Sequence, residues 1–171
     1  MTQTAVYWIT GLSGAGKTTV ATAVKKQLGK DFVLLDGDVM RKGLSKDLGF
    51  SIADRRENIR RVAETSKLLV DNGKSCICTF ISPTKEIRNL AKTIIGADRF
   101  NEIYINTPIT ICEKRDPKGL YKKVRAGEIK EFTGISSVYE APESPDLLLD
   151  CHTYSIEESV QQLFAYINRQ S

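Results

Sequence analysis

Metal-ligand patterns and long apolar runs are both missing from this sequence of 171 residues. Its one histidine, His152, has no partner at ligand spacing, and its four cysteines form no C-x-x-C pair. Cys76 and Cys78 alternate along an apolar run, which predicts reduced thiols on one face of a buried strand. No segment reaches the length of a membrane span, and Met1–Thr4 has no basic residue of a signal or transit peptide. We therefore expect a cytoplasmic protein without a membrane partner.

Length and composition predict one globular domain, residues 1–171. A chain of 171 residues can bury one substantial core but is too short for two ordinary domains. Its hydrophobic fraction of 41% and charged fraction of 27% are typical of folded proteins.

The most informative segment is Gly11–Thr18, GLSGAGKT, which fits the phosphate-loop pattern G-x-x-x-x-G-K-[ST]. An apolar, β-branched run precedes it and a helical apolar pattern follows it, which is the context that this motif requires. The pattern predicts that backbone N–H groups surround a polyphosphate, that Lys17 reaches the β- and γ-phosphates and that the Thr18 hydroxyl binds Mg²⁺. We expect ATP and Mg²⁺ as cofactors. The residues expected to bind ATP are Gly11, Leu12, Ser13, Gly14, Ala15, Gly16, Lys17, Thr18 and Thr19.

Strand and helix patterns alternate along the chain. This order predicts an α/β fold with a mostly parallel sheet, helices on both faces and ligands at the carboxyl ends of the strands. The expected strands are residues 5–9, 32–35, 75–81, 102–106 and 147–149, and the expected helices are residues 18–28, 53–72, 85–95, a short one from 108, and 156–169.

Polar residues follow the strands at the edge where such folds bind ligands. Asp36 and Asp38 follow the second strand, and Ser82 follows the third. Phosphoryl transfer needs carboxylates to hold Mg²⁺ and to orient the attacking hydroxyl, and a pair separated by one residue can divide those tasks. No acidic residue ends the third strand, so Asp36 and Asp38 are the expected metal-holding carboxylates, together with Thr18.

A basic segment follows the short helix that begins at Pro108. Residues 113–132 hold seven basic and four acidic side chains and lack sustained apolar periodicity. This composition predicts a mobile lid, about residues 115–134, that meets phosphate. A nucleic-acid surface is not expected, because the rest of the chain is nearly balanced in charge.

Several longer blocks make the chain resemble the adenylylsulfate kinase family. The blocks are Leu35–Asp38 (LDGD), Asp47–Ser51 (DLGFS), Asp54–Arg61 (DRRENIRR), Phe80–Pro83 (FISP), Arg115–Lys123 (RDPKGLYKK), Arg125–Glu128 (RAGE), Phe132–Ile135 (FTGI) and Tyr139–Pro142 (YEAP). This resemblance implies transfer of the γ-phosphate of ATP to the 3′-hydroxyl of adenosine 5′-phosphosulfate.

The resemblance also implies residue roles. It gives Lys17, Asp38 and Ser82 as catalytic, and Arg115 as a further residue at ATP. Phe50 and Phe132 are implied to stack on the two faces of the substrate adenine, with Phe132 arriving as the lid closes. The implied substrate-binding residues are Asp38, Arg41, Phe50, Arg55, Asn58, Ile81, Ser82, Lys118, Leu120 and Phe132.

Family members are sometimes described as passing phosphate through the serine that is Ser82 here. Direct in-line transfer with Asp38 beside the 3′-hydroxyl is chemically simpler, and no basic partner for Ser82 is evident in the sequence. The chain departs from the family at Val39, where asparagine is usual, and at Thr84-Lys85, where an aromatic residue or histidine and then arginine are usual. Two alternative functions stay open: a kinase for another nucleotide anhydride such as a cytidine diphosphate derivative, and a non-enzymatic nucleotide switch. A homodimer is also left open as the assembly state.

Overall fold

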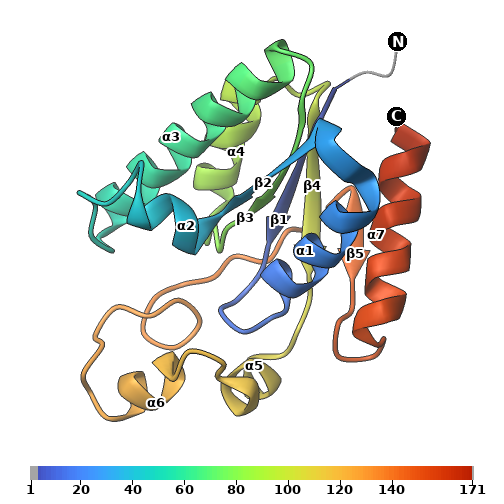
Figure 1. The fold of residues 1–171 in the computed structure, drawn as a ribbon. Coiled ribbons are helices and arrows are strands. Elements are labelled where there is room, and N and C mark those ends of the chain that lie inside the picture. Colours follow the sequence, from blue (N-terminus) through green and yellow to red (C-terminus); the bar gives the residue numbers. More distant parts are fainter. Residues whose placement is uncertain (1–3, 171) are drawn as a thin grey trace.

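The computed structural model describes residues 4–170, which form an α/β fold around one sheet (Figure 1). Every strand pair is parallel, in the order β2-β3-β1-β4-β5. The strands are β1 (Val6–Thr10), β2 (Phe32–Asp36), β3 (Ser75–Thr79), β4 (Phe100–Ile105) and β5 (Leu147–Leu149). The expected fold class is confirmed. The expectation of no targeting signal at residues 1–4 falls mostly outside the described residues.

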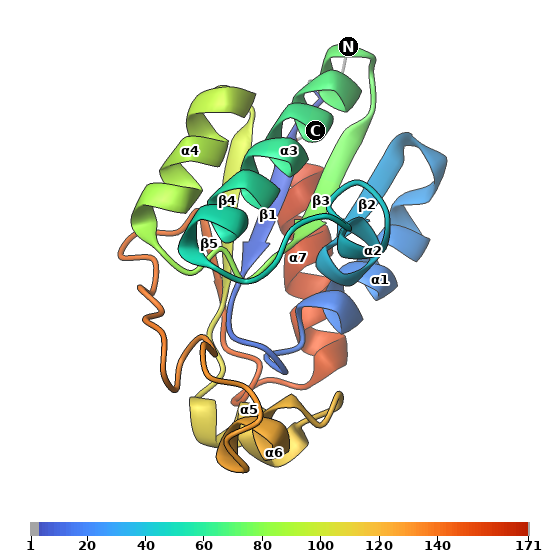
Figure 2. The same ribbon diagram turned by 90° about the vertical axis from the view of Figure 1, so that its left-hand side faces the viewer.

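Helices cover both faces of the sheet. Figures 1 and 2 show α1 and α7 on one face and α3 and α4 on the other, with α5 and α6 beyond one end of the sheet. The helices are α1 (Lys17–Leu28), α2 (Gly37–Lys42), α3 (Ile52–Asp71), α4 (Lys85–Ile95), α5 (Ile109–Arg115), α6 (Leu120–Arg125) and α7 (Ile156–Gln170), with a 3₁₀ turn at Gly29–Asp31. Within residues 4–170, no helix is both long and apolar enough to cross a membrane.

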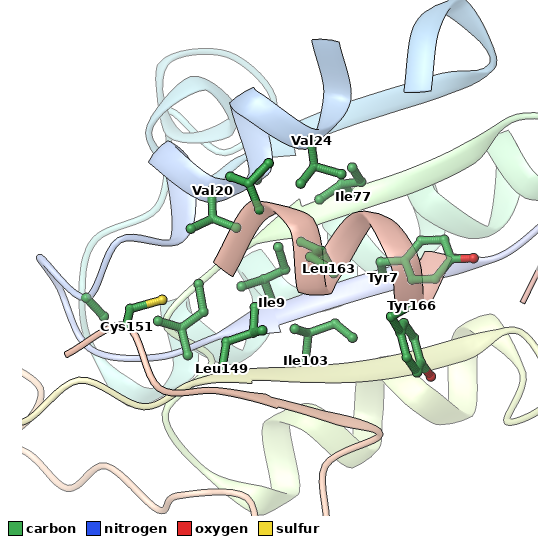
Figure 3. Packing of buried hydrophobic residues seen from close by; sticks show 14 of the residues in the cluster. Tyr7, Ile9, Val20, Val24, Ile77, Ile103, Leu149, Cys151, Leu163 and Tyr166 are labelled. Atoms are coloured by element: carbon green, nitrogen blue, oxygen red, sulfur yellow. The ribbon is translucent and has the colours of Figure 1, made fainter. Parts of the chain in front are cut away.

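Successive residues of β1 enter different cores because side chains alternate along a strand. Tyr7 and Ile9 belong to the buried cluster beneath α1 and α7, which also contains Leu163 of α7 (Figure 3). Val6 and Trp8 belong to the cluster beneath α3 and α4. The two cores fix β1 at the centre of the sheet, and so they fix the loop that leaves its carboxyl end.

The cysteine prediction is confirmed. Cys76 and Cys78 are free thiols buried on the same face of β3, in the cluster with Trp8. Burial raises the pKa of the Cys76 thiol to about 12. Both thiols are therefore protonated core groups at neutral pH.

Local signals set most element ends. The Ser51 side chain accepts a hydrogen bond from the Asp54 N–H and begins α3, and Gly73, with φ of 78°, follows its last turn.

Two helices, α2 and α6, do not appear in the sequence patterns. The helix α2 is short, and Asp36 caps it through a hydrogen bond from the Asp38 N–H. The segment that the sequence predicted only as polar site residues after the second strand therefore begins a helix.

The basic segment contains more structure than expected. Its helix α6 carries one fully buried side chain, Tyr121, which packs with the buried cluster beneath α1 and α7. The remaining α6 side chains are partly or fully exposed, and this explains the lack of apolar periodicity. We keep the term lid for residues 115–134.

Candidate active site

The phosphate loop lies between β1 and α1, and its glycines are required by their surroundings. Gly11, Gly14 and Gly16 all have positive φ values, of 152°, 75° and 110°. A Cβ atom at Gly11 would stand 2.7 Å from the Ile105 carbonyl oxygen, and one at Gly14 would stand 3.0 Å from the Cys112 carbonyl oxygen. The loop is therefore pressed against the end of β4 and against α5, and side chains at these two positions would displace it.

Lys17 is held inside this loop. Its ammonium group donates hydrogen bonds to the carbonyl oxygens of Gly11, at 2.8 Å, and Leu12, at 2.7 Å. Burial, and to a smaller extent the repulsion from the Lys118 ammonium, lower the Lys17 pKa from 10.5 to about 8. A bound phosphate group would place a negative charge beside the buried ammonium and would favour its charged form.

Side chains from residues 107–121 hold the back of the loop. The Tyr121 hydroxyl donates to the Ser13 carbonyl at 2.8 Å, and the Thr107 hydroxyl donates to the Ala15 carbonyl at 3.0 Å. Arg115 donates to the Ala15 carbonyl at 3.4 Å and to the Cys151 carbonyl at 2.9 Å. Arg115 therefore lies beside the loop, and its expected role at ATP stays a prediction.

Thr18 and Asp36 form the arrangement that suits a magnesium ion. The Thr18 and Thr79 hydroxyls both donate to Oδ2 of Asp36, at 2.7 and 2.8 Å, and the Asp38 N–H donates to Oδ1 at 3.0 Å. Burial alone would raise the Asp36 pKa, but these hydrogen bonds outweigh it and lower the pKa below its usual value. An ionised carboxylate beside a hydroxyl oxygen fits Mg²⁺, which prefers hard oxygen ligands.

Asp38 has a different environment from Asp36. It lies in the first turn of α2, its side chain is about half exposed, and its carboxylate forms an ion pair with Lys118 of the lid. Asp36 is thus fixed inside the protein, whereas Asp38 is accessible to a substrate. The two aspartates therefore lie in different environments, and a division of tasks between them stays a prediction.

Two arginines surround Phe50 between α2 and α3. The Arg41 guanidinium carbon lies 4.3 Å from the centre of the Phe50 ring, and that of Arg55 lies 5.8 Å from it. Burial lowers the pKa of Arg41, and the repulsion from Arg55 lowers it further. An anion bound beside the exposed ring would relieve this repulsion, and the forked guanidinium donors suit its paired oxygens.

Arg55 also joins this region to the lid. It donates to the Phe50 carbonyl at 2.7 Å, to the Thr133 hydroxyl at 3.0 Å and to the Glu131 carbonyl at 3.1 Å. The last two partners stand on either side of Phe132 in the sequence. One guanidinium therefore holds together the two segments that carry Phe50 and Phe132.

The two phenylalanines that are expected to stack on the substrate adenine lie in different environments. Phe50 is 60% exposed, but Phe132 is only 7% exposed. The Phe132 ring packs edge-on against Tyr121, with ring centres 4.9 Å apart. Phe132 therefore already has a protein partner, and its stacking on a substrate stays a prediction.

Two further residues are expected to bind the substrate, Asn58 of α3 and Leu120 of the lid. Asn58 is buried, and its Oδ1 atom has no hydrogen-bond partner in the described part of the chain. An unused buried acceptor usually has a ligand or water partner, so this observation fits a substrate contact. Leu120 is partly buried against the cluster beneath α1 and α7, so its expected role as a substrate residue stays a prediction.

Ser82 is buried in a strained turn after β3. Its φ is 39°, and its hydroxyl accepts a hydrogen bond from the Trp8 indole N–H at 3.1 Å. The carbonyl of its neighbour Ile81 accepts from the Thr10 hydroxyl at 2.7 Å. The Ser82 hydroxyl therefore contacts an indole instead of a general base, which does not favour its use as a nucleophile.

Several residues that build the site were not identified from the sequence. Trp8, Thr79 and Tyr121 act through side chains that looked like ordinary strand or lid residues. Thr79 offers the clearest missed signal, because it ends β3 at the level where Asp36 ends β2. Paired strand ends in a parallel sheet lie side by side.

Comparison with known proteins shows extensive similarity. Residues 3–150 match the family model for adenylylsulphate kinase. An adenylyl-sulfate kinase of Shewanella amazonensis is 52% identical over 166 residues, which make up 95% of this chain and 84% of that protein. The structure of the Mycobacterium tuberculosis APS kinase in complex with AMPPNP and APS is similar with a TM-score of 0.92 and 45% identity, over 98% of this chain and 99% of that one. A hexameric APS kinase from Thiobacillus denitrificans has a TM-score of 0.73 at 31% identity, over 98% of this chain and 29% of that longer chain.

Proposed function

Because the chain belongs to the adenylylsulphate kinase family, we propose that it transfers the γ-phosphate of ATP to the 3′-hydroxyl of adenosine 5′-phosphosulfate. The products are ADP and 3′-phosphoadenosine 5′-phosphosulfate. The similar M. tuberculosis enzyme was solved with AMPPNP, an analogue of ATP, and with APS.

One observation about this chain carries the proposal. The carboxyl edge of the sheet holds a phosphate loop after β1 and, beyond β2, an exposed aromatic ring with two arginines whose charges no described carboxylate neutralises through an ion pair. A phosphate loop alone would serve any nucleotide. The ring with Arg41 and Arg55 adds what a second nucleotide with a charged anhydride needs, which is a stacking surface and forked donors for paired oxygens.

On the donor side, Lys17 moves from the carbonyl oxygens of its own loop to the β- and γ-phosphates. Its ammonium offsets the charge that spreads over the transferring group. Thr18 and Asp36 are the residues that we propose to hold Mg²⁺, which would offset the negative charge of the phosphate groups when bound.

On the acceptor side, Arg41 and Arg55 bind the phosphosulfate, and the Asn58 amide meets the sugar. Asp38 accepts a hydrogen bond from the 3′-hydroxyl and orients its oxygen in line with the γ-phosphorus. The new oxygen–phosphorus bond forms as the bond to the β-phosphate oxygen breaks, and ADP leaves. The hydroxyl proton passes to the Asp38 carboxylate. Lys118, which pairs with Asp38 in this structure, is then free to contact the substrate.

We propose the whole chain as one catalytic unit with residues 115–134 as its lid, with no nucleic-acid or membrane partner and with a cytoplasmic location. A homodimer is our proposed assembly, and size measurement in solution tests it. The substrate is tested by measuring ADP release with a panel of acceptors that includes adenosine 5′-phosphosulfate, adenosine 5′-phosphate and cytidine diphosphate derivatives. We expect release to be fastest with adenosine 5′-phosphosulfate. Preference for a cytidine acceptor would replace this function with the other kinase activity, and no acceptor-dependent release would favour a nucleotide switch.

A further inference from the structure

The turn at residues 81–83, which follows β3, is held in an unfavourable conformation. Ser82 has φ of 39°, a value that residues with a side chain rarely adopt, and it precedes Pro83, which further restricts its backbone. Such a conformation persists only where the surroundings enforce it, and it is frequent at ligand sites.

Hydrogen bonds occupy all three carbonyl groups of this turn. The Ile81 carbonyl accepts from Thr10 at 2.7 Å, that of Ser82 from Arg88 at 3.0 Å, and that of Pro83 from the Glu140 N–H at 2.7 Å. By contrast, the amide N–H groups of Ile81 and Ser82 donate to no other residue within 4–170. The turn therefore fixes its acceptors inside the protein and keeps its two donors for something else.

Arg88 is the one charged member of this arrangement. It lies on α4 with its side chain only 4% exposed, and its Nε atom is 2.8 Å from Oε1 of Glu102 on β4. A buried ion pair adds little net stability compared with well-packed apolar side chains, because both charges lose their hydration. The fold alone therefore does not need a guanidinium at this place, whereas the Ser82 carbonyl does need a donor.

We infer that Arg88, held by Glu102, is a positioning residue of the acceptor site. It fixes the Ser82 carbonyl and with it the left-handed turn, so that the Ile81 and Ser82 amides stand ready to bind the acceptor nucleotide. This inference rests on the proposed function. Arg88 does not contact the substrate and acts through the backbone of the turn.

The experiment must separate positioning from stability. Arg88→Met alone leaves Glu102 buried without its partner, and this variant is expected to be unstable. The informative variant is the double substitution Arg88→Met with Glu102→Met, which removes both charges and keeps the volume. We expect its melting temperature to stay within about 5 °C of wild type.

In this double variant we expect the KM for adenosine 5′-phosphosulfate to rise about tenfold or more, while the KM for ATP changes less than about twofold. Arg99→Met is the matched control, because Arg99 also joins a carboxylate, Asp71, and a backbone carbonyl, that of Ile95, but away from the turn. We expect it to leave both KM values unchanged.

Wild-type KM for adenosine 5′-phosphosulfate in a folded double variant would overturn the inference, and so would an equal rise in both KM values. Failure of the wild-type protein itself to phosphorylate adenosine 5′-phosphosulfate would instead overturn the proposed function. The two failures are therefore distinguishable.

Discussion

The Lys118 ammonium of the lid forms an ion pair with the Asp38 carboxylate in the first turn of α2. The two residues are 80 positions apart, and their side chains are 49% and 58% exposed. An ion pair this exposed contributes at most about 1 kcal/mol. The contact brings the lid over Asp38, and it is weak enough for a substrate to replace it.

The two aspartates should respond differently to the same substitution. Asp38→Asn keeps the shape of an exposed side chain but removes the charge that orients the acceptor, so we expect turnover to fall about 100-fold or more with little change in melting temperature. Asp36→Asn disturbs a carboxylate that accepts three hydrogen bonds and should also cost about 1–3 kcal/mol of stability. Steady-state kinetics and thermal unfolding measure the two effects.

Asp31→Asn is the control for this pair, because Asp31 also forms an exposed ion pair with a lysine, Lys74, but at the opposite end of β2. Its turnover should equal that of wild type. Turnover of Asp38→Asn within tenfold of wild type would transfer the acceptor role to Asp36.

Phe50 offers a test of base stacking that is free of stability effects, because its side chain is largely exposed. Phe50→Ala should raise the KM for adenosine 5′-phosphosulfate about 5- to 150-fold, which corresponds to about 1–3 kcal/mol of stacking. The melting temperature should not change. Ile52→Ala, at an even more exposed neighbour, is the control. Equal kinetics of the Phe50 variant and wild type would remove Phe50 from the acceptor site.

Phe132→Ala should behave differently from Phe50→Ala. Its ring is buried against Tyr121, so the substitution loosens the lid as well as the acceptor site. We expect kcat to fall together with the rise in KM for adenosine 5′-phosphosulfate. Limited proteolysis should show faster cleavage within residues 115–134. An unchanged kcat would mean that the packing of Phe132 does not matter for lid function.

Ser82→Ala tests the phosphoserine route. The Trp8 indole N–H loses its acceptor, so we expect a loss of about 1–3 kcal/mol in the free energy of unfolding. Turnover should stay within about tenfold of wild type, because transfer is in line. Wild-type protein incubated with γ-labelled ATP alone should carry no label on Ser82. A label on Ser82 that the acceptor can discharge would contradict this mechanism.

The lowered pKa of Lys17 predicts a pH dependence of ATP binding. A lysine with a pKa of about 8 is mostly charged at pH 7 and mostly neutral at pH 9. ATP binding requires the charged form, so at high pH the Lys17 side chain must take up a proton when ATP binds. We expect the Kd for ATP to rise about tenfold between pH 7 and pH 9. Titration calorimetry measures this value, and Lys17→Met should bind more weakly but with no such change.

Equal ATP affinity of the wild-type protein at pH 7 and pH 9 would show that Lys17 stays charged throughout this range. The same calorimetric titrations at pH 8, repeated in buffers that differ in ionisation enthalpy, should reveal proton uptake on binding.

Much of the fold follows from local signals in the sequence. The bounds of α4 and β5 agree with the prediction. Apolar periodicity and the Thr84 cap define α4, and a run of three leucines marks β5. The helix α2 was missed because its first residues, Asp36–Asp38, have the composition of a turn, and it is too short to show periodicity. The helix α6 was missed because its one buried side chain, Tyr121, gives no repeat.

The site likewise contains residues that local patterns predict and contacts that they do not predict. Lys17 and Thr18 could be predicted from the phosphate-loop pattern, and Asp36 could be predicted because it follows a strand. The contacts from Arg55 to Thr133 and from Trp8 to Ser82 span 78 and 74 positions. Such contacts depend on how the lid and the sheet pack, and no local pattern encodes them. The same holds for Arg88, which reads as an ordinary helix residue.

The phosphate loop has a consequence for protein engineering. Its Ser13 and Ala15 carbonyls depend on hydroxyl and guanidinium donors that stand 92 to 108 positions further along the chain. Residues 11–18 grafted into another sheet would lose these donors. The loop is therefore not a portable module, and a functional transplant must include the segment from Thr107 to Tyr121.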